Sequence, residues 1–160
     1  MFTHLHLHTE YSLLDATIRI QDLVEKLQAN KMTACAITDH GSMYGVFKFQ
    51  SAMKKAGLKP IIGCEIYIAP RRMEDKEYGI DNNYFHLVLL AKNLQGYKNL
   101  VKLVSAGHMD GFYYRPRVDI DTLKKYSEGL IATSACLAGP IAQPLLNNDY
   151  KTAKKNAELY

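Results

Sequence analysis

Apolar residues recur at helical spacing in six stretches of the chain. In residues 18–30, for example, Ile20, Leu23, Val24 and Leu27 fall three or four positions apart, so they would share one face of an amphipathic helix. The same reasoning predicts helices over residues 43–56, 96–108, 121–127, 140–146 and 149–160.

Shorter apolar runs between these helices predict strands, of which the run over 33–38 is expected to be buried. The longest covers residues 60–70, lies between two prolines and carries one charged residue, Glu65. Because strands and helices alternate, we expect a parallel α/β architecture, either an open sheet or a barrel. The other predicted strands cover 33–38, 84–91 and 129–134, and the polar stretches 9–17, 71–83 and 111–117 are expected to be loops.

The N-terminal run from His4 to Thr9 alternates imidazole and leucine with a period of two, which is typical of a strand. His4, His6 and His8 would then project from one face. Three imidazoles do not make an ordinary core, whereas paired neutral histidine nitrogens are ligands for zinc, manganese or iron. The alternatives are a solvated strand face and imidazoles that are hydrogen-bonded to their neighbours.

Further candidate ligands lie within the predicted strands or after them. Glu65 places a carboxylate in an apolar run, which is costly unless it pairs with Arg or Lys or binds a cation. Taken alone, His86 would be a core or rim histidine, and Cys136 a small buried side chain. Together with Asp15 and His40, however, these residues form a zinc-compatible set of donors.

These polar residues lie near strand ends, and this position bears on the architecture. A barrel gathers its strand ends on one face, whereas an open sheet distributes them along a crevice. Since a metal cluster requires convergence, the barrel is favoured. The chain has no Gly-rich phosphate loop, dinucleotide-binding fingerprint or serine nucleophile elbow, so metal-assisted hydrolysis is the chemistry that the residues leave.

Composition narrows the class of protein only slightly. With 160 residues, 48% hydrophobic and 22% charged, the chain fits one globular domain. A net charge of +4 tolerates a nucleic-acid partner without arguing for one. Three widely spaced cysteines without a CxxC motif indicate a reducing cytoplasm, and no apolar run is long enough for a membrane span. The last helix reaches Tyr160 without a cap, which predicts a fragment of a longer protein.

Four motifs resemble the polymerase and histidinol phosphatase (PHP) family: His6-Leu7-His8-Thr9 with Asp15, Ile37-Thr38-Asp39-His40-Gly41, Lys59 to Glu65, and His86-Leu87. The longer phrases resemble, more narrowly, the N-terminal PHP domain of bacterial C-family replicative DNA polymerases, along nearly the whole chain. They are HLHTEYSLLDA, ITDHGSMYGVFKF, GLKPIIGCEIYIAP, FHLVLLAKN and GLIATSACLAGPI.

The resemblance implies a distorted seven-stranded (β/α) TIM-like barrel, of which residues 1–160 would be the N-terminal portion. It implies up to three divalent ions, usually zinc, with manganese or iron as alternatives. Asp39 is expected to support the ligands, and no role is carried over to His4. The family's last Asp-x-His ligand pair, the polymerase palm with its magnesium site, the fingers and the clamp-binding regions have no match here. The implied ligands are His6, His8, Asp15, His40, Glu65, His86 and Cys136, with Glu65, His8 and Asp15 as the catalytic residues.

The resemblance further implies a 3′–5′ proofreading exonuclease in a bacterial cytoplasmic DNA polymerase. The alternatives are a metal-stabilised structural or docking module without catalysis and a stand-alone histidinol-phosphatase-like phosphoesterase. The implied partners are a DNA primer–template, other polymerase domains, the sliding clamp, the clamp loader and a separate exonuclease. Arg115, Arg117, Tyr113 and Tyr114 could contact DNA or another domain, but a solvated loop is the favoured interpretation.

Overall fold

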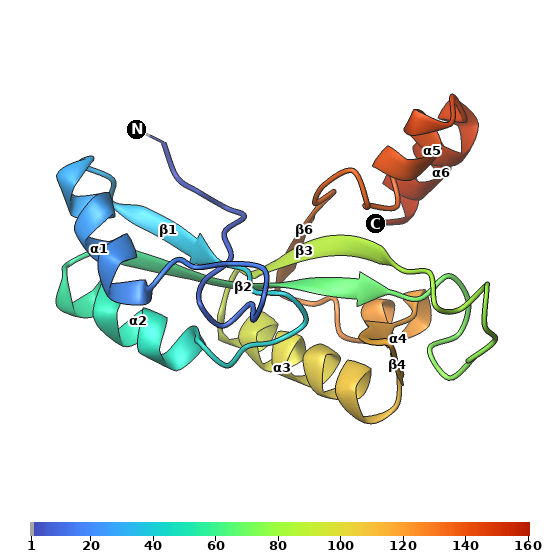
Figure 1. The fold of residues 1–160 in the computed structure, drawn as a ribbon, viewed down its shortest axis with the longest axis horizontal. Helices are drawn as coiled ribbons and strands as arrows, with labels where there is room; N and C mark the ends of the chain where they lie inside the picture. The colour runs from blue at the N-terminus through green and yellow to red at the C-terminus, as the bar shows by residue number, and fades with distance from the viewer. Residues whose placement is uncertain (1) are drawn as a thin grey trace.

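The structure, a computed structural model, describes residues 2–160, which form six strands and six helices (Figure 1). The predicted helices are confirmed, with ends that differ by a few residues. In chain order the elements are α1 (Ile20–Ala29), β1 (Ala34–Ile37), α2 (Val46–Lys55), β2 (Lys59–Ile68), β3 (Phe85–Ala91), α3 (Leu94–Met109), β4 (Phe112–Tyr113), β5 (Arg115–Val118), α4 (Ile120–Lys125), β6 (Leu130–Thr133), α5 (Ala142–Leu146) and α6 (Tyr150–Leu159).

The long strand β2 organises the sheet, whose order is β4-β5-β2-β3-β6, with β1 also paired to β2. β1 and β5 run parallel to β2, whereas β3 runs antiparallel to both β2 and β6. The α/β class is confirmed, but the expectation of an all-parallel arrangement is wrong. The segment between β2 and β3 contains no helix, and without a crossover the chain returns antiparallel. In residues 2–160, β4 and β6 are the first and last strands of this order, and β1 pairs with β2 outside it.

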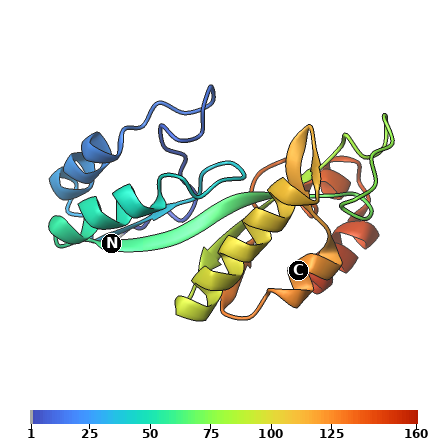
Figure 2. The ribbon, with the colours of Figure 1, turned by 90° about the horizontal axis from the view of Figure 1, so that it is seen from below.

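The two faces of the sheet carry different side chains. Cys64 and Ile66 of β2 pack with Leu87 of β3 against Leu100 and Leu103 of α3. Figure 2 shows α3 lying across the sheet on this side. Because successive strand residues point to opposite faces, the residues between them face away from α3. Glu65 of β2 and His86 of β3 therefore share the opposite face of the sheet.

Residues 111–117 are not the loop that the sequence predicts. Phe112 pairs with Pro116 and Tyr113 with Arg115, so β4 and β5 form a short hairpin. The turn residue Tyr114 has a φ of 59°. Neither strand has an apolar run that would reveal it.

The solvated interpretation is also wrong for Arg117, whose side chain is fully buried. Its guanidinium donates hydrogen bonds to the carbonyl oxygens of Gly111 (3.2 Å), Asp81 (2.5 Å), Met73 (3.0 Å) and Asp75 (3.0 Å). A planar group with five N–H donors can satisfy several carbonyls that turn inward. Arg117 thereby ties the irregular segment between β2 and β3 to the hairpin.

The strand predicted over the N-terminal histidines is wrong as well. Only an isolated parallel bridge between His4 and Cys35 forms there. Leu7 packs against the core around α1 and α2, whereas Leu5 is exposed, so the two leucines do not share a buried face. The segment is held instead by hydrogen bonds between Leu7 and Thr38, and His6 and His8, on either side of Leu7, turn toward β2. No helix in residues 2–160 has the length and apolar character needed to cross a membrane.

Candidate metal centre

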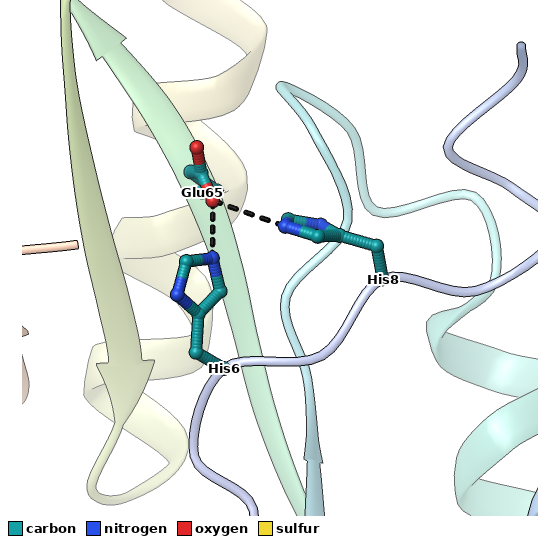
Figure 3. A group of neighbouring side chains, drawn as sticks. All are labelled: His6, His8 and Glu65. Atoms are coloured by element: carbon teal, nitrogen blue, oxygen red, sulfur yellow. Dashed lines mark hydrogen bonds and ion pairs between the residues drawn. The ribbon is translucent and has the colours of Figure 1, made fainter. Parts of the chain in front are cut away.

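Glu65 is a buried carboxylate surrounded by four imidazoles. Its side chain is 1% exposed. Oε2 contacts Nε2 of His6 and lies 3.2 Å from Nε2 of His8, as Figure 3 shows. Oε1 lies 2.5 Å from Nδ1 of His86 and 3.5 Å from Nδ1 of His40. No arginine or lysine of the described chain forms an ion pair with Glu65, so the simple charge-pair alternative does not account for it.

Backbone hydrogen bonds position His6 and His8 over β2. The Leu7 amide donates to Oγ1 of Thr38 (2.8 Å), and the Thr38 amide donates to the Leu7 carbonyl (2.9 Å). Leu7 is thus fixed at the end of β1, and the histidines on either side of it extend toward Glu65. His4 is not part of the group; its ring contacts Phe2, 4.8 Å between centroids.

His40 reaches the centre because the chain turns sharply after β1. It forms an isolated parallel bridge with Glu65, and the next residue, Gly41, has a φ of 57°. A Cβ atom at Gly41 would lie 2.8 Å from side-chain carbons of both Pro116 and Tyr67. The turn therefore requires glycine for its backbone conformation and for the space around it.

The Asp39 carboxylate holds the N-terminal loop in place next to the centre through hydrogen bonds. Its buried carboxylate accepts hydrogen bonds from the amide (2.6 Å) and hydroxyl (2.8 Å) of Thr9 and from the hydroxyl of Ser12 (2.8 Å). Ser12 Oγ in turn accepts a hydrogen bond from the His40 amide (3.1 Å). Asp39 therefore fixes the backbone next to both His8 and His40, as expected of a supporting carboxylate.

The two remaining predicted ligands lie at the edge of the centre. Oδ2 of Asp15 is 2.6 Å from Nε2 of His40, and the Asp15 side chain is 62% exposed. Sγ of Cys136 is 3.6 Å from Nδ1 of His86. The structure thus gathers all seven predicted ligands in one place. Two sets have donor atoms within 4.8 Å of one another, and Glu65 belongs to both: His6, His8 and Glu65, and Glu65, His86 and Cys136.

Three buried polar atoms of the centre lack a hydrogen-bond partner among the described residues: Nδ1 of His8, Nδ1 of His40 and Oε1 of Glu65. Each unpartnered buried polar group costs about 1–3 kcal/mol. His40 and His86 approach Oε1 without hydrogen-bond geometry, so proton sharing does not satisfy it. Nitrogen, oxygen and sulfur donors in this arrangement fit a divalent cation of the zinc type.

The electrostatics keep Glu65 ionised. Burial alone would raise the pKa of its carboxyl, but the interactions with His6, His8 and His86 outweigh burial and hold that pKa far below its usual range. Burial alone would lower the pKa of His8, but its hydrogen bond to Glu65 raises it overall. A permanent negative charge on one buried carboxylate suits a group shared by two cations.

A cleft of about 520 Å³ opens beside the centre. Asp15, His40 and His86 line it, together with residues that no sequence motif assigns to the site. Tyr67 could have been found, because it lies two positions after Glu65 in the same strand and so shares its face. Tyr44, Tyr84 and His108 also line the cleft, and no local pattern marks them. Arg115 lines it too, and it is one of the residues that the sequence offers as a contact for DNA or another domain.

The PHP domain family model matches residues 4–160, so the chain belongs to the PHP domain family. It is 50% identical over 154 residues to the DNA polymerase III subunit alpha of Borreliella burgdorferi, covering 96% of this chain and 13% of that protein. It is 44% identical over 160 residues to the same subunit of Treponema pallidum, covering 99% of this chain and 14% of that protein. The chain thus spans about an eighth of the length of these relatives. A solved amidohydrolase from Chromobacterium violaceum superposes with a TM-score of 0.47 at 19% identity, over 65% of this chain and 32% of the amidohydrolase.

Proposed function

We propose that this PHP domain binds two or three divalent ions around Glu65 and hydrolyses phosphodiester bonds as a 3′–5′ exonuclease within a replicative DNA polymerase. The observation that carries the proposal is the sharing of one buried, ionised carboxylate by four imidazoles. The likeness to DNA polymerase III subunit alpha supplies the choice of DNA as substrate.

His6, His8 and Glu65 would hold one ion, and Glu65, His86 and Cys136 would hold a second, so Glu65 would serve both ions. Asp15 and His40 form a third donor pair at the cleft. Bound divalent ions polarise a phosphoryl oxygen, lower the pKa of water and stabilise the leaving oxygen. Zinc fits the donor set best, with manganese and iron as alternatives.

Two protein groups of the centre would hold ligands in place or exclude water, and a third, Asp15, would accept a proton. Asp39 holds the loop of His8 and the turn of His40 in place through Thr9 and Ser12. Burial of Glu65 keeps bulk water away from its carboxylate oxygens. Asp15 is exposed on the cleft side, where its carboxylate can accept a proton released by water during hydrolysis.

A second candidate is a metal-stabilised structural or docking module without catalysis. It is favoured by the number of segments that the centre joins: the N-terminal loop, the end of β1, β2, β3 and the segment after β6. Ions at such a junction would hold the sheet and the N-terminus together. Contacts with other polymerase domains, the clamp, the clamp loader or a separate exonuclease are compatible with both candidate functions. Magnesium at a polymerase site elsewhere is also compatible with both.

The test is degradation of a primer with a mismatched 3′ end by the purified protein, with bound metal measured on the same sample. We expect degradation that a chelator abolishes and that His8→Ala and Glu65→Gln lose, while Glu74→Gln, at an exposed carboxylate on the segment after β2, degrades at the wild-type rate. Bound metal without degradation would favour the structural module. Degradation that survives Glu65→Gln would contradict the proposed centre.

A further inference from the structure

The cleft beside the metal centre extends from the proposed metal ligands to the positively charged side chain of Arg115. Asp15, His40 and His86 line the cleft, and so does Arg115 at the start of β5. Between them lie the rings of Tyr67 and Tyr84, 5.0 Å apart in an edge-to-face arrangement. A ligand that occupies the cleft would therefore contact both the centre and Arg115.

Arg115 is an arginine of the cleft whose charge is stabilised by Tyr84 and, more weakly, by Asp15, without a direct ion pair. Arg71 pairs with Glu77 and Asp81, and Arg72 pairs with Glu74, whereas no carboxylate in residues 2–160 forms an ion pair with Arg115. Its guanidinium carbon lies 6.0 Å from the centroid of the Tyr67 ring. Aromatic packing orients the planar guanidinium, whose fork of N–H donors matches two phosphate oxygens.

Two other groups in the cleft suit a nucleotide. Ser42 is 6% exposed, and its hydroxyl has no hydrogen-bond partner among the described residues. Tyr44 lines the same cleft but is 72% exposed, with a ring face open to solvent. An unpartnered hydroxyl can donate to a phosphate oxygen, and an open tyrosine ring can stack on a base without regard to its identity.

We propose that this cleft binds the end of a single DNA strand, with Arg115 holding a backbone phosphate, Ser42 donating to it and Tyr44 stacking on a base. The inference rests on the proposed function, since it assigns the substrate site of the same centre. Arg115 is a positioning residue here: it contacts the strand away from the reacting phosphodiester. Its loss should weaken binding of DNA and leave the metal in place.

The test is the fluorescence anisotropy of a labelled single-stranded oligodeoxynucleotide whose 3′-terminal linkages are phosphorothioates, which slow hydrolysis, titrated with purified protein that keeps its metal. We expect Arg115→Gln to raise Kd about tenfold and to reduce the slope of log K against log salt by about 1, the effect of one lost phosphate contact. Arg115→Lys keeps the positive charge but loses the forked pair of N–H donors. Its Kd should lie between the values for wild type and Arg115→Gln. Arg72→Gln, at an exposed arginine on the segment after β2, is the matched control and should bind as wild type does.

Kinetics and metal content separate this inference from the proposed function. We expect Arg115→Gln to raise KM with bound metal unchanged. If Glu65→Gln abolishes degradation while Arg115→Gln leaves Kd and KM within twofold of wild type, the inference is wrong and the exonuclease stands. If Arg115→Gln weakens DNA binding by a protein that degrades nothing, the cleft stands and the exonuclease is wrong. Absence of binding by the wild type would overturn the inference directly.

Discussion

Nδ1 of His86 lies 2.5 Å from Oε1 of Glu65, although neither residue is the other's direct partner across the strands. Glu65 pairs with Val88, and His86 pairs with Tyr67. Diagonal neighbours on one face of an antiparallel pair are close enough for long side chains to meet. The geometry of the centre therefore depends on the register between β2 and β3, and a slip by one residue would turn the imidazole to the α3 side.

The support that Asp39 gives the centre predicts a loss of metal affinity without loss of a ligand. Asp39→Asn replaces one acceptor oxygen by a donor, so at least one bond from Thr9 or Ser12 is lost. We expect metal affinity to fall about 10- to 100-fold, as when groups that orient ligands are changed. Competition with a fluorescent chelator measures the change. Asp110→Asn, at an exposed residue after α3, should have no effect, and equal losses in both variants would contradict the prediction.

Gly41 and Gly57 both have a left-handed backbone, and a comparison of the two measures how closely side chains pack around the turn after His40. Gly57 has a φ of 72°, and a Cβ added there would have nothing within 4 Å, whereas a Cβ at Gly41 meets Pro116 and Tyr67 at 2.8 Å. Gly57→Ala should lower the free energy of unfolding by about 1–2 kcal/mol, the cost of the backbone alone. Gly41→Ala should cost more, because side chains must also move. Urea denaturation checks both, and an equal loss would show that the turn is not crowded.

Arg117→Lys should destabilise the protein although it keeps the charge. A lysine has three donors on one atom and cannot reach carbonyls of Gly111, Met73, Asp75 and Asp81 together. Leaving two buried carbonyls unsatisfied should lower the free energy of unfolding by about 2–4 kcal/mol. Arg72→Lys, whose partner is the exposed Glu74, should change it by less than about 0.5 kcal/mol. A small effect of Arg117→Lys would mean that water replaces the lost bonds.

The lowered pKa of the Asp119 carboxyl predicts that the protein loses part of its stability at acid pH. Burial raises the pKa of its carboxyl, but hydrogen bonds from Thr122 and from the Met73 amide outweigh burial and lower that pKa overall. Because the folded-state pKa lies below the unfolded value of about 3.9, the contribution is complete above that pH and is lost as pH falls through the folded value. The difference in stability between wild type and Asp119→Asn should therefore shrink below about pH 4. A difference that stays constant down to about pH 2 would contradict this account.

The sequence pattern predicts the elements that local periodicity controls. Spacing of three and four residues places α1 within two residues of each end, and alternation along β2 places Glu65 on the face opposite Cys64 and Ile66. The same alternation fails for the N-terminal histidines, since that segment has one bridge and no strand partner to maintain a pleat. There, contacts with Thr38 and Asp39 set the backbone.

The remaining features depend on contacts between distant segments. The burial of Arg117 is due to carbonyl groups around residues 73–81 that turn inward, which no spacing reveals. The antiparallel direction of β3 follows from a long connection without a helix, and the polar pattern of residues 71–83 predicts a loop without indicating its direction. The position of Arg115 in the cleft likewise requires the β4–β5 hairpin to lie beside β2.

The measurement that tests the account most directly is the number of metal ions bound per molecule, by mass spectrometry of the native protein, in wild type, Glu65→Gln and Glu74→Gln. If Glu65 is the shared ligand, the wild type binds at least two zinc, manganese or iron ions, Glu74→Gln binds the same number, and Glu65→Gln loses at least one. A wild type without bound metal, or a Glu65→Gln protein with the full number of ions, would contradict the proposed centre.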